Sequence, residues 1–387
     1  MAALRKASAI VIGIVSAILL ATNLSALYAG KPAPPPPPVH YELKWLGTLG
    51  GLQSTANDIN YEGVVVGDSY DVLGNPRPFV CSPPYDVIVD LNDIAPVPAG
   101  WTLTRAKEIN SLGQIVGSAF NSETSKSQAY VFDQAGGTLT LLPLSDEQSF
   151  SHHGYCINDL GEVAAVRTGP LQYYAVLYRR DVTSGDYFVW QEFPFGSPTA
   201  MNNFGQLVNV SGQLYDADTR TLFTFTDDRD IRDINDLGVF VGGVDVPSKK
   251  PPGSVDRAAY RDPDGPGPAL EILTKGRTYG CRAYGVNLDA DVCLVGPASK
   301  AGQNAPFIYT DEDGLLALND LLVGTTSDLA KWSESSWVGT FVSAISDRSV
   351  VAPQVSHGWG RICGTATFRI ADDANDPTEA FVLTPKP

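Results

Sequence analysis

Basic residues are scarce in this sequence. Its 387 residues include 27 Lys and Arg against 43 Asp and Glu, which gives a net charge of −16. Without a basic excess the protein has little with which to neutralise phosphates, so we expect no nucleic-acid partner. The same charge disfavours electrostatic adhesion to an anionic membrane surface. An acidic surface also attracts cations, but solubility is the simpler explanation.

Cysteine is also scarce, and the sequence shows little helical periodicity. The five cysteines form no CxxC pair, so we expect no zinc site. Several are flanked by strand-forming residues, which favours buried free thiols; disulfides are the alternative in an exported chain. Gly (37) and Pro (28) are plentiful instead. That balance is typical of many short strands joined by tight turns.

The N-terminal apolar run is short for a membrane span. Arg5 and Lys6 precede an uncharged stretch from Ala7 to Ala21, whereas a spanning helix needs about 20 apolar residues. This pattern predicts a signal peptide over residues 1–29, with an uncleaved signal anchor as the alternative. Residues 30–40 are rich in proline and predict an extended linker. We therefore expect a secreted or periplasmic protein with no membrane span beyond that possible N-terminal anchor.

What the sequence does contain is an internal repeat. An aliphatic residue, then Asn, then Gly three positions later recurs at steps of 50, 48, 44, 33, 52 and 59 residues. Blades of four-stranded β-propellers repeat at roughly 40–50 residues. The repeated position is occupied by Asn60, Asn110, Asn158, Asn202, Asn235, Asn287 and Ser346, of which the last two belong to degraded copies.

The repeat has a local physical explanation. The Asn side chain can hydrogen-bond the backbone two residues further on, and Gly supplies the left-handed conformation that closes the turn. Asn-x-x-Gly is therefore typical of a β-hairpin, and its recurrence argues against catalysis by these Asn residues. A third strand such as Ala129–Phe132 and a fourth such as Thr138–Leu142 follow in most units.

Four strands per unit predict an all-β fold, a seven-bladed β-propeller of four-stranded blades forming one domain over residues 41–387. A linear β-solenoid is the alternative, although it would need shorter repeats and capping ends. The last unit ends after its third strand at residues 380–383, and a surplus strand at residues 41–46 precedes the first unit. Pairing between these two strands would close the ring and satisfy both exposed edges.

The first unit carries a resemblance to a known family. Leu46–Gly51 (LGTLGG) leads into Ile59-Asn60 and Val65–Gly67, and later units contain an Ala-aromatic strand such as Gln128–Tyr130. These elements resemble the HAF-repeat family of bacterial extracellular proteins, with the His of the family's His-Ala-Phe element replaced. The resemblance implies an exported, propeller-like repeat protein and provides no catalytic residues.

Two acidic turns are candidates for binding calcium, the one cofactor that we consider. Asp262 and Asp264 lie in one turn, Asp311 and Asp313 lie in another, and each pair is followed by Gly. Closely spaced carboxylates on such a turn can direct oxygen ligands at Ca²⁺. A plain hairpin turn between the third and fourth strands is the favoured interpretation, because neither turn continues into a full calcium loop.

Aromatic residues gather in the seventh unit. Trp332, Trp337, His357 and Trp359 could form a loop platform that stacks against sugar rings. The alternative is that these side chains belong to the core, where propeller strands also bury aromatics.

These observations favour a non-catalytic function. We expect an exported, monomeric module that binds an extracellular glycan, an envelope component or a protein, because no catalytic constellation is recognisable. The alternative is an extracellular hydrolase or lyase with carboxylates at the central channel of the propeller, where strands from several blades converge. Two carboxyl groups close together in that channel would favour the enzyme.

Overall fold

The computed structural model describes residues 40–144, 151–168, 172–225, 230–247, 254–261, 271–272, 281–297, 304–310, 314–334, 336–346, 360–368 and 377–386. The chain divides into two units, Met1–Pro38 and Val39–Pro387. All described residues belong to the second unit. The predicted leader and most of the linker lie outside the described residues, and those boundaries stay predictions.

The second unit is built from β-strands, which confirms the predicted all-β class. Five four-stranded sheets follow one another along the chain, each with its strands in sequential order. Neighbouring strands within them are antiparallel, as short connecting turns require. The first two sheets consist of β6 (Trp101–Ile109), β7 (Gln114–Asn121), β8 (Lys126–Asp133) and β9 (Thr138–Leu141), then β10 (His152–Ile157), β11 (Val163–Thr168), β12 (Tyr173–Arg180) and β13 (Tyr187–Pro194).

The next three sheets repeat this plan. They consist of β14 (Pro198–Met201), β15 (Gln206–Asn209), β16 (Gln213–Asp216) and β17 (Thr221–Thr224); β18 (Asp230–Ile234), β19 (Phe240–Pro247), β20 (Ser254–Arg261) and β21 (Glu271–Ile272); and β22 (Arg282–Val286), β23 (Val292–Pro297), β24 (Asn304–Thr310) and β25 (Gly314–Ala317).

A nine-stranded sheet joins the two ends of the second unit. One part contains β2 (Gly50–Ile59), β3 (Val65–Asp71), β4 (Pro76–Cys81) and β5 (Val89–Asp90). The other contains β1 (His40–Gly47), β26 (Leu322–Val323), β27 (Ser336–Ile345), β28 (Ile362–Thr367) and β29 (Thr378–Lys386). The single parallel pair Gln53–Thr378 connects β2 to β29.

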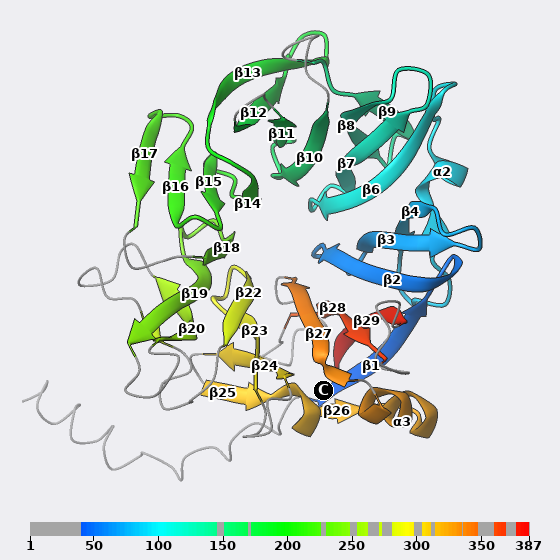
Figure 1. Ribbon diagram of the computed structural model, residues 1–387, viewed down its shortest axis with the longest axis vertical. Helices are drawn as coiled ribbons and strands as arrows, with labels where there is room; N and C mark the ends of the chain where they lie inside the picture. Colours follow the sequence, from blue (N-terminus) through cyan, green and yellow to red (C-terminus); the bar gives the residue numbers. More distant parts are fainter. Residues whose placement is uncertain are drawn as a thin grey trace, which may run out of the picture. The chain divides into compact units, whose positions relative to one another are not determined.

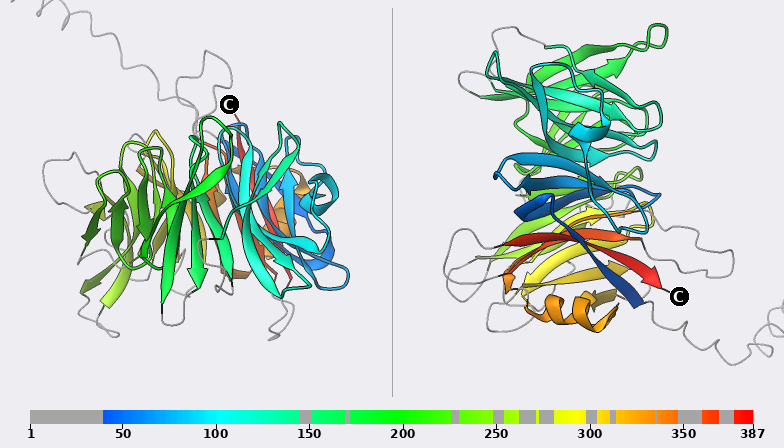
Figure 2. Two further views of the ribbon diagram at one scale, coloured as in Figure 1. Left: turned by 90° about the horizontal axis from the view of Figure 1, so that it is seen from above. Right: turned by 90° about the vertical axis from the view of Figure 1, so that its right-hand side faces the viewer.

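The N-terminal strand lies beside the C-terminal one, as Figure 2 shows. β1 pairs antiparallel with β29 from His40 opposite Lys386 to Gly47 opposite Ala380, so the predicted pairing of these two strands is present. The described helices are short: α2 (Leu91–Ile94), α3 (Thr326–Glu334) and the 3₁₀ turn η1 (Leu318–Asp320). Among the described residues, none of the helices has the length and apolarity that crossing a membrane requires.

The sheets surround a common centre, so the fold is propeller-like (Figure 1). The strands nearest the centre contact one another in chain order, and the last of them contacts the first. These innermost strands are β2, β6, β10, β14, β18, β22 and β27.

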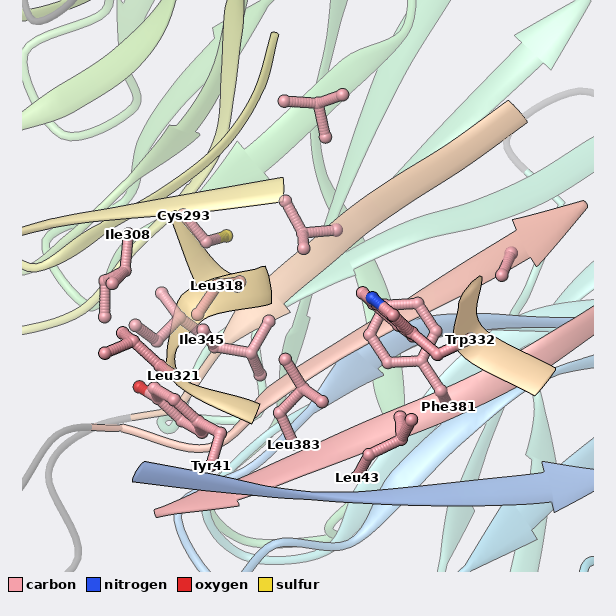
Figure 3. Packing of buried hydrophobic residues seen from close by; sticks show 14 residues of the cluster. Tyr41, Leu43, Cys293, Ile308, Leu318, Leu321, Trp332, Ile345, Phe381 and Leu383 are labelled. Atoms are coloured by element: carbon pink, nitrogen blue, oxygen red, sulfur yellow. The ribbon is translucent and has the colours of Figure 1, made fainter. Parts of the chain in front are cut away.

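The hydrophobic core lies between neighbouring sheets. One cluster packs Val66 and Val80 against Leu103 and Ile115 of the following sheet, and others fill the later junctions in the same way. The largest cluster packs β23 and β24 against β1, β28 and β29, with Tyr41, Phe381 and Leu383 buried in it (Figure 3). Because a sheet between two neighbours buries both of its faces, its central strands carry near-continuous apolar runs and do not alternate between apolar and polar residues.

Candidate functional site

A ring of repeated asparagines lines a cavity at the centre of the sheets, which we call the channel. We call Asn60, Asn110, Asn158, Asn202, Asn235, Asn287 and Ser346 the motif residues, and count positions in each unit from them. In the second unit, Asn110 Oδ1 accepts hydrogen bonds from Leu112 N (3.1 Å) and Gln114 N (2.9 Å), and Gly113 has a φ of 75°. The hairpin interpretation is therefore confirmed.

The same asparagines also link the sheets. Asn60 Nδ2 donates to the carbonyl of Asn110 (3.2 Å), and Asn110 Nδ2 donates to the carbonyl of Asn158 (2.9 Å). Four further bonds of this kind continue around the ring to the carbonyl of Ser346. All seven motif residues are buried. Their role is structural, because both ends of each amide are used to hold backbone groups.

A β-bulge interrupts every innermost strand three residues before the motif residue. The register shifts between Ala56 and Asp58, between Ala106 and Glu108, and at the equivalent place in the other five strands. A bulge leaves one residue unpaired and redirects its side chain. The bulge residues at position −3 are Asn57, Lys107, Tyr155, Thr199, Arg232, Tyr284 and Ser343.

All seven bulge residues line one cavity of about 680 Å³. This volume lies in the range of small-molecule sites, roughly 300–1,000 Å³. A narrower cavity of about 190 Å³ is lined by the motif residues, and Asp58 and Glu108 line both cavities. These two carboxyl groups therefore lie where the narrow and wide spaces meet.

Three carboxyl groups at position −2 face this channel: Asp58, Glu108 and Asp233. Asp58 uses both oxygens, since Oδ1 accepts from Ile59 N and Oδ2 from Ile109 N, each at 2.8 Å. Asp233 does the same with Ile234 N and Val286 N. These aspartates brace one sheet against the next.

Glu108 differs from the two aspartates in its bonding. Its Oε2 accepts from Ile157 N at 2.6 Å, while its Oε1 accepts no hydrogen bond from the described part of the chain. The extra methylene of glutamate lets one oxygen brace the neighbouring sheet while the other stays available to the channel.

Burial controls the protonation of this pair. Removal from water raises the pKa of Asp58 to about 6, against the pull of its two backbone donors. Burial raises the pKa of Glu108 well above its usual range, and the negative charge of Asp58 raises it further. Burial and the nearby charge of Asp58 therefore both favour the protonated form of Glu108. Carboxyl groups with raised pKa values are typical of acid–base sites.

Of the predicted aromatic platform, Trp332 is a core residue. It lies in α3, is 4% exposed, and packs against Phe381 with ring centroids 5.1 Å apart. Trp337 belongs to β27, but its side chain lies outside the described part of the structure. His357 and Trp359 lie outside the described residues altogether.

The predicted calcium turns are not covered by the structure. Asp262, Asp264, Asp311 and Asp313 all lie outside the described residues. The described residues contain no group of three or more His, Cys, Asp or Glu side chains that could hold a metal ion. All five cysteines are buried free thiols.

Several solved structures are similar to the chain. An oligogalacturonate lyase from Vibrio parahaemolyticus has a TM-score of 0.45 at 11% identity, covering 88% of this chain and 93% of that one. An oligogalacturonate lyase in complex with manganese has a TM-score of 0.47 at 11% identity, covering 90% and 97%. Pyrococcus horikoshii acylaminoacyl peptidase has a TM-score of 0.43 at 11% identity, covering 83% and 51%. No protein-family model and no curated protein matches the sequence.

The interpretation as a non-catalytic binding or structural module is wrong. Asp58 and Glu108 both line the channel and interact electrostatically, which favours the enzymatic alternative.

Sequence reasoning missed Asp58 and Glu108, although both stand in the repeated segment. The available signal was an acidic residue two positions before the motif residue in three of the seven units. The hairpin pattern explained the Asn and Gly of the repeat but left that acidic position without an explanation.

Proposed function

We propose that the second unit is a seven-bladed β-propeller closed by β1. Dividing the nine-stranded sheet at its single Gln53–Thr378 pair leaves β2–β5 as one blade and β27, β28, β29 and β1 as another. The seven motif residues and the core clusters between successive sheets support this count. The resemblance to HAF-repeat proteins and the predicted leader support an exported protein, secreted or periplasmic.

The proposed activity is that of a hydrolase or lyase acting on an extracellular polymer in the channel. Glu108 carries the proposal because its Oε1 accepts no hydrogen bond from the described residues, burial raises its pKa well above the usual range, and it lines both cavities. Such a group is suited to general acid catalysis. Burial is the main cause of the raised pKa of Glu108, and the negative charge of Asp58 adds to it.

The proposed chemistry is protonation of the leaving oxygen. As a C–O bond of the polymer breaks, Glu108 Oε1 passes its proton to the departing oxygen and becomes a carboxylate. Hydrolysis adds water at the carbon and returns a proton to Glu108. Elimination instead removes a proton from the neighbouring carbon, and that proton restores the acid. Both reactions share the step that Glu108 performs.

The test is a screen of purified residues 39–387 against extracellular polysaccharides. Release of reducing ends detects both reactions, and ultraviolet absorbance of an unsaturated product identifies elimination. We expect Glu108→Gln to lower kcat by about 10²–10⁴-fold. Gln can still accept the bond from Ile157 N, so folding should be retained. The matched control is Asp86→Asn, an exposed carboxyl group paired with Lys44 at 2.9 Å. Equal activity of Glu108→Gln and wild-type protein would rule out the proposed acid.

A further inference from the structure

The seven bulge residues divide into two kinds. Three are short and polar, and each donates a hydrogen bond to a carbonyl of the next sheet: Asn57 to Ala106 (2.7 Å), Thr199 to Ile231 (2.9 Å) and Ser343 to Ala56 (2.6 Å). These three side chains act as braces between sheets. The remaining four are large, and they are Lys107, Tyr155, Arg232 and Tyr284.

The four large bulge residues form two cation–tyrosine pairs. Lys107 Nζ lies 5.8 Å from the centre of the Tyr155 ring, and Arg232 Cζ lies 5.6 Å from the centre of the Tyr284 ring. Each pair spans two neighbouring sheets. In Figure 1 the strands of the first pair, β6 and β10, lie across the centre from those of the second, β18 and β22. Both pairs line the same wide cavity.

The two cations differ in their pairing. Lys107 forms no ion pair with any described residue, and burial raises the pKa of its neighbour Glu108. Asp230 is shared by two guanidinium groups, with Arg232 Nε at 2.6 Å from Oδ1 and Arg282 Nη1 at 3.3 Å from Oδ2. The carboxylates of Asp58 and Asp233 also line the cavity, and their oxygens accept hydrogen bonds from backbone N–H groups. Each pair therefore places one cationic side chain beside a tyrosine on the cavity wall, and Lys107 is the cation that has no ion pair among the described residues.

We propose that these two pairs bind an acidic glycan, a chain of sugar units that carry carboxylate groups. A tyrosine ring offers a flat apolar face for a sugar ring, and the adjacent cation pairs with its carboxylate. The inference rests on the proposed function for the use of this cavity as a substrate site, and it adds the class of substrate. Acidic glycans are recognised by Lys107 with Tyr155 on one wall and by Arg232 with Tyr284 on the other.

The test measures binding by titration calorimetry in the Glu108→Gln variant, so that turnover does not interfere. The probes are oligomers of galacturonic acid and the same oligomers with their carboxylates methyl-esterified. We expect the acidic oligomer to bind at least about tenfold more tightly, with affinity falling as salt rises. Lys107→Met should remove about tenfold of that affinity. The matched control Lys44→Met removes a lysine paired outside the cavity and should change nothing.

A tyrosine series tests the stacking component. Tyr155→Phe keeps the ring and should bind normally, whereas Tyr155→Ala should weaken binding. Equal affinity for acid and ester, or full affinity in Lys107→Met, would overturn the inference. Turnover restricted to neutral polymers would also overturn it while leaving the proposed function intact. Lys107-dependent binding of the acidic oligomer without any turnover would support the inference and contradict the proposed function.

Discussion

The motif residues and the bulge residues are neighbouring rings of the same strands, yet they differ in composition. Six of the seven motif positions are Asn, whereas the seven bulge positions hold six different residue types. The motif side chains hold turns and link sheets, so one residue type fits all units. The bulge residues stand outside the ladder, so their identity is not fixed by strand pairing. The uniform ring forms the framework, and the variable ring lines the wide cavity in which we propose that a ligand binds.

The largest expected effect on stability comes from the uniform ring. Asn158→Ala removes the acceptor of Leu160 N and Glu162 N and the donor to the Asn202 carbonyl. Leaving such buried groups unsatisfied should lower the free energy of unfolding by about 2–4 kcal/mol. Chemical denaturation measures this decrease in the free energy of unfolding. Asn158→Asp, which keeps the acceptor and loses the donor, should cost less; equal losses would contradict the linking role.

A second effect on stability depends on pH. The folded-state pKa of Asp58 is about 6, and that of Glu108 is also raised by burial. The unfolded chain therefore loses these protons first, and stability present at about pH 4 declines as pH rises through about 6. Tm should fall over this pH range, and the fall should be smaller in the Glu108→Gln variant. That variant should therefore be more stable than the wild-type protein at neutral pH. Identical profiles for the two proteins would refute the raised pKa of Glu108.

A bracing bulge residue should have a milder effect than a motif residue. Thr199→Val removes the hydroxyl that donates to the Ile231 carbonyl at 2.9 Å. One lost hydrogen bond predicts a decrease of about 1 kcal/mol in the free energy of unfolding. Thr199→Ser keeps the hydroxyl and is the matched control in the same denaturation experiment.

The smallest effect belongs to a projecting bulge residue. Lys107→Met keeps the aliphatic stem and removes only a charge that forms no ion pair within the described structure. Its free energy of unfolding should change by less than about 0.5 kcal/mol. A large loss of stability here would remove the distinction between the two rings.

The sequence predicted the framework because that framework is local. Asn-x-x-Gly specifies a turn by itself, and the surplus strand at residues 41–46 implied a partner for the last strand. The bulge was not predictable in this way, since a residue such as Lys107 looks like any other strand residue. Its unpaired state depends on register with the neighbouring strand. The sequence left Trp332 between a loop platform and the core, because α3 interrupts the all-β pattern; Thr325 Oγ1 accepts from Asp328 N at its start.

The ring of amide links has one junction of a different kind. Ser346 carries a hydroxyl in place of the side-chain amide, and between β27 and β2 the hydroxyl of Ser343 donates to the Ala56 carbonyl at 2.6 Å. The six amide links made by the asparagines run from Asn60 to Ser346 and do not include this junction. Native-state hydrogen exchange should therefore report the lowest opening free energy where β27 meets β2. Such an opening would let the interior of a long polymer enter from the side, without passage of a free end.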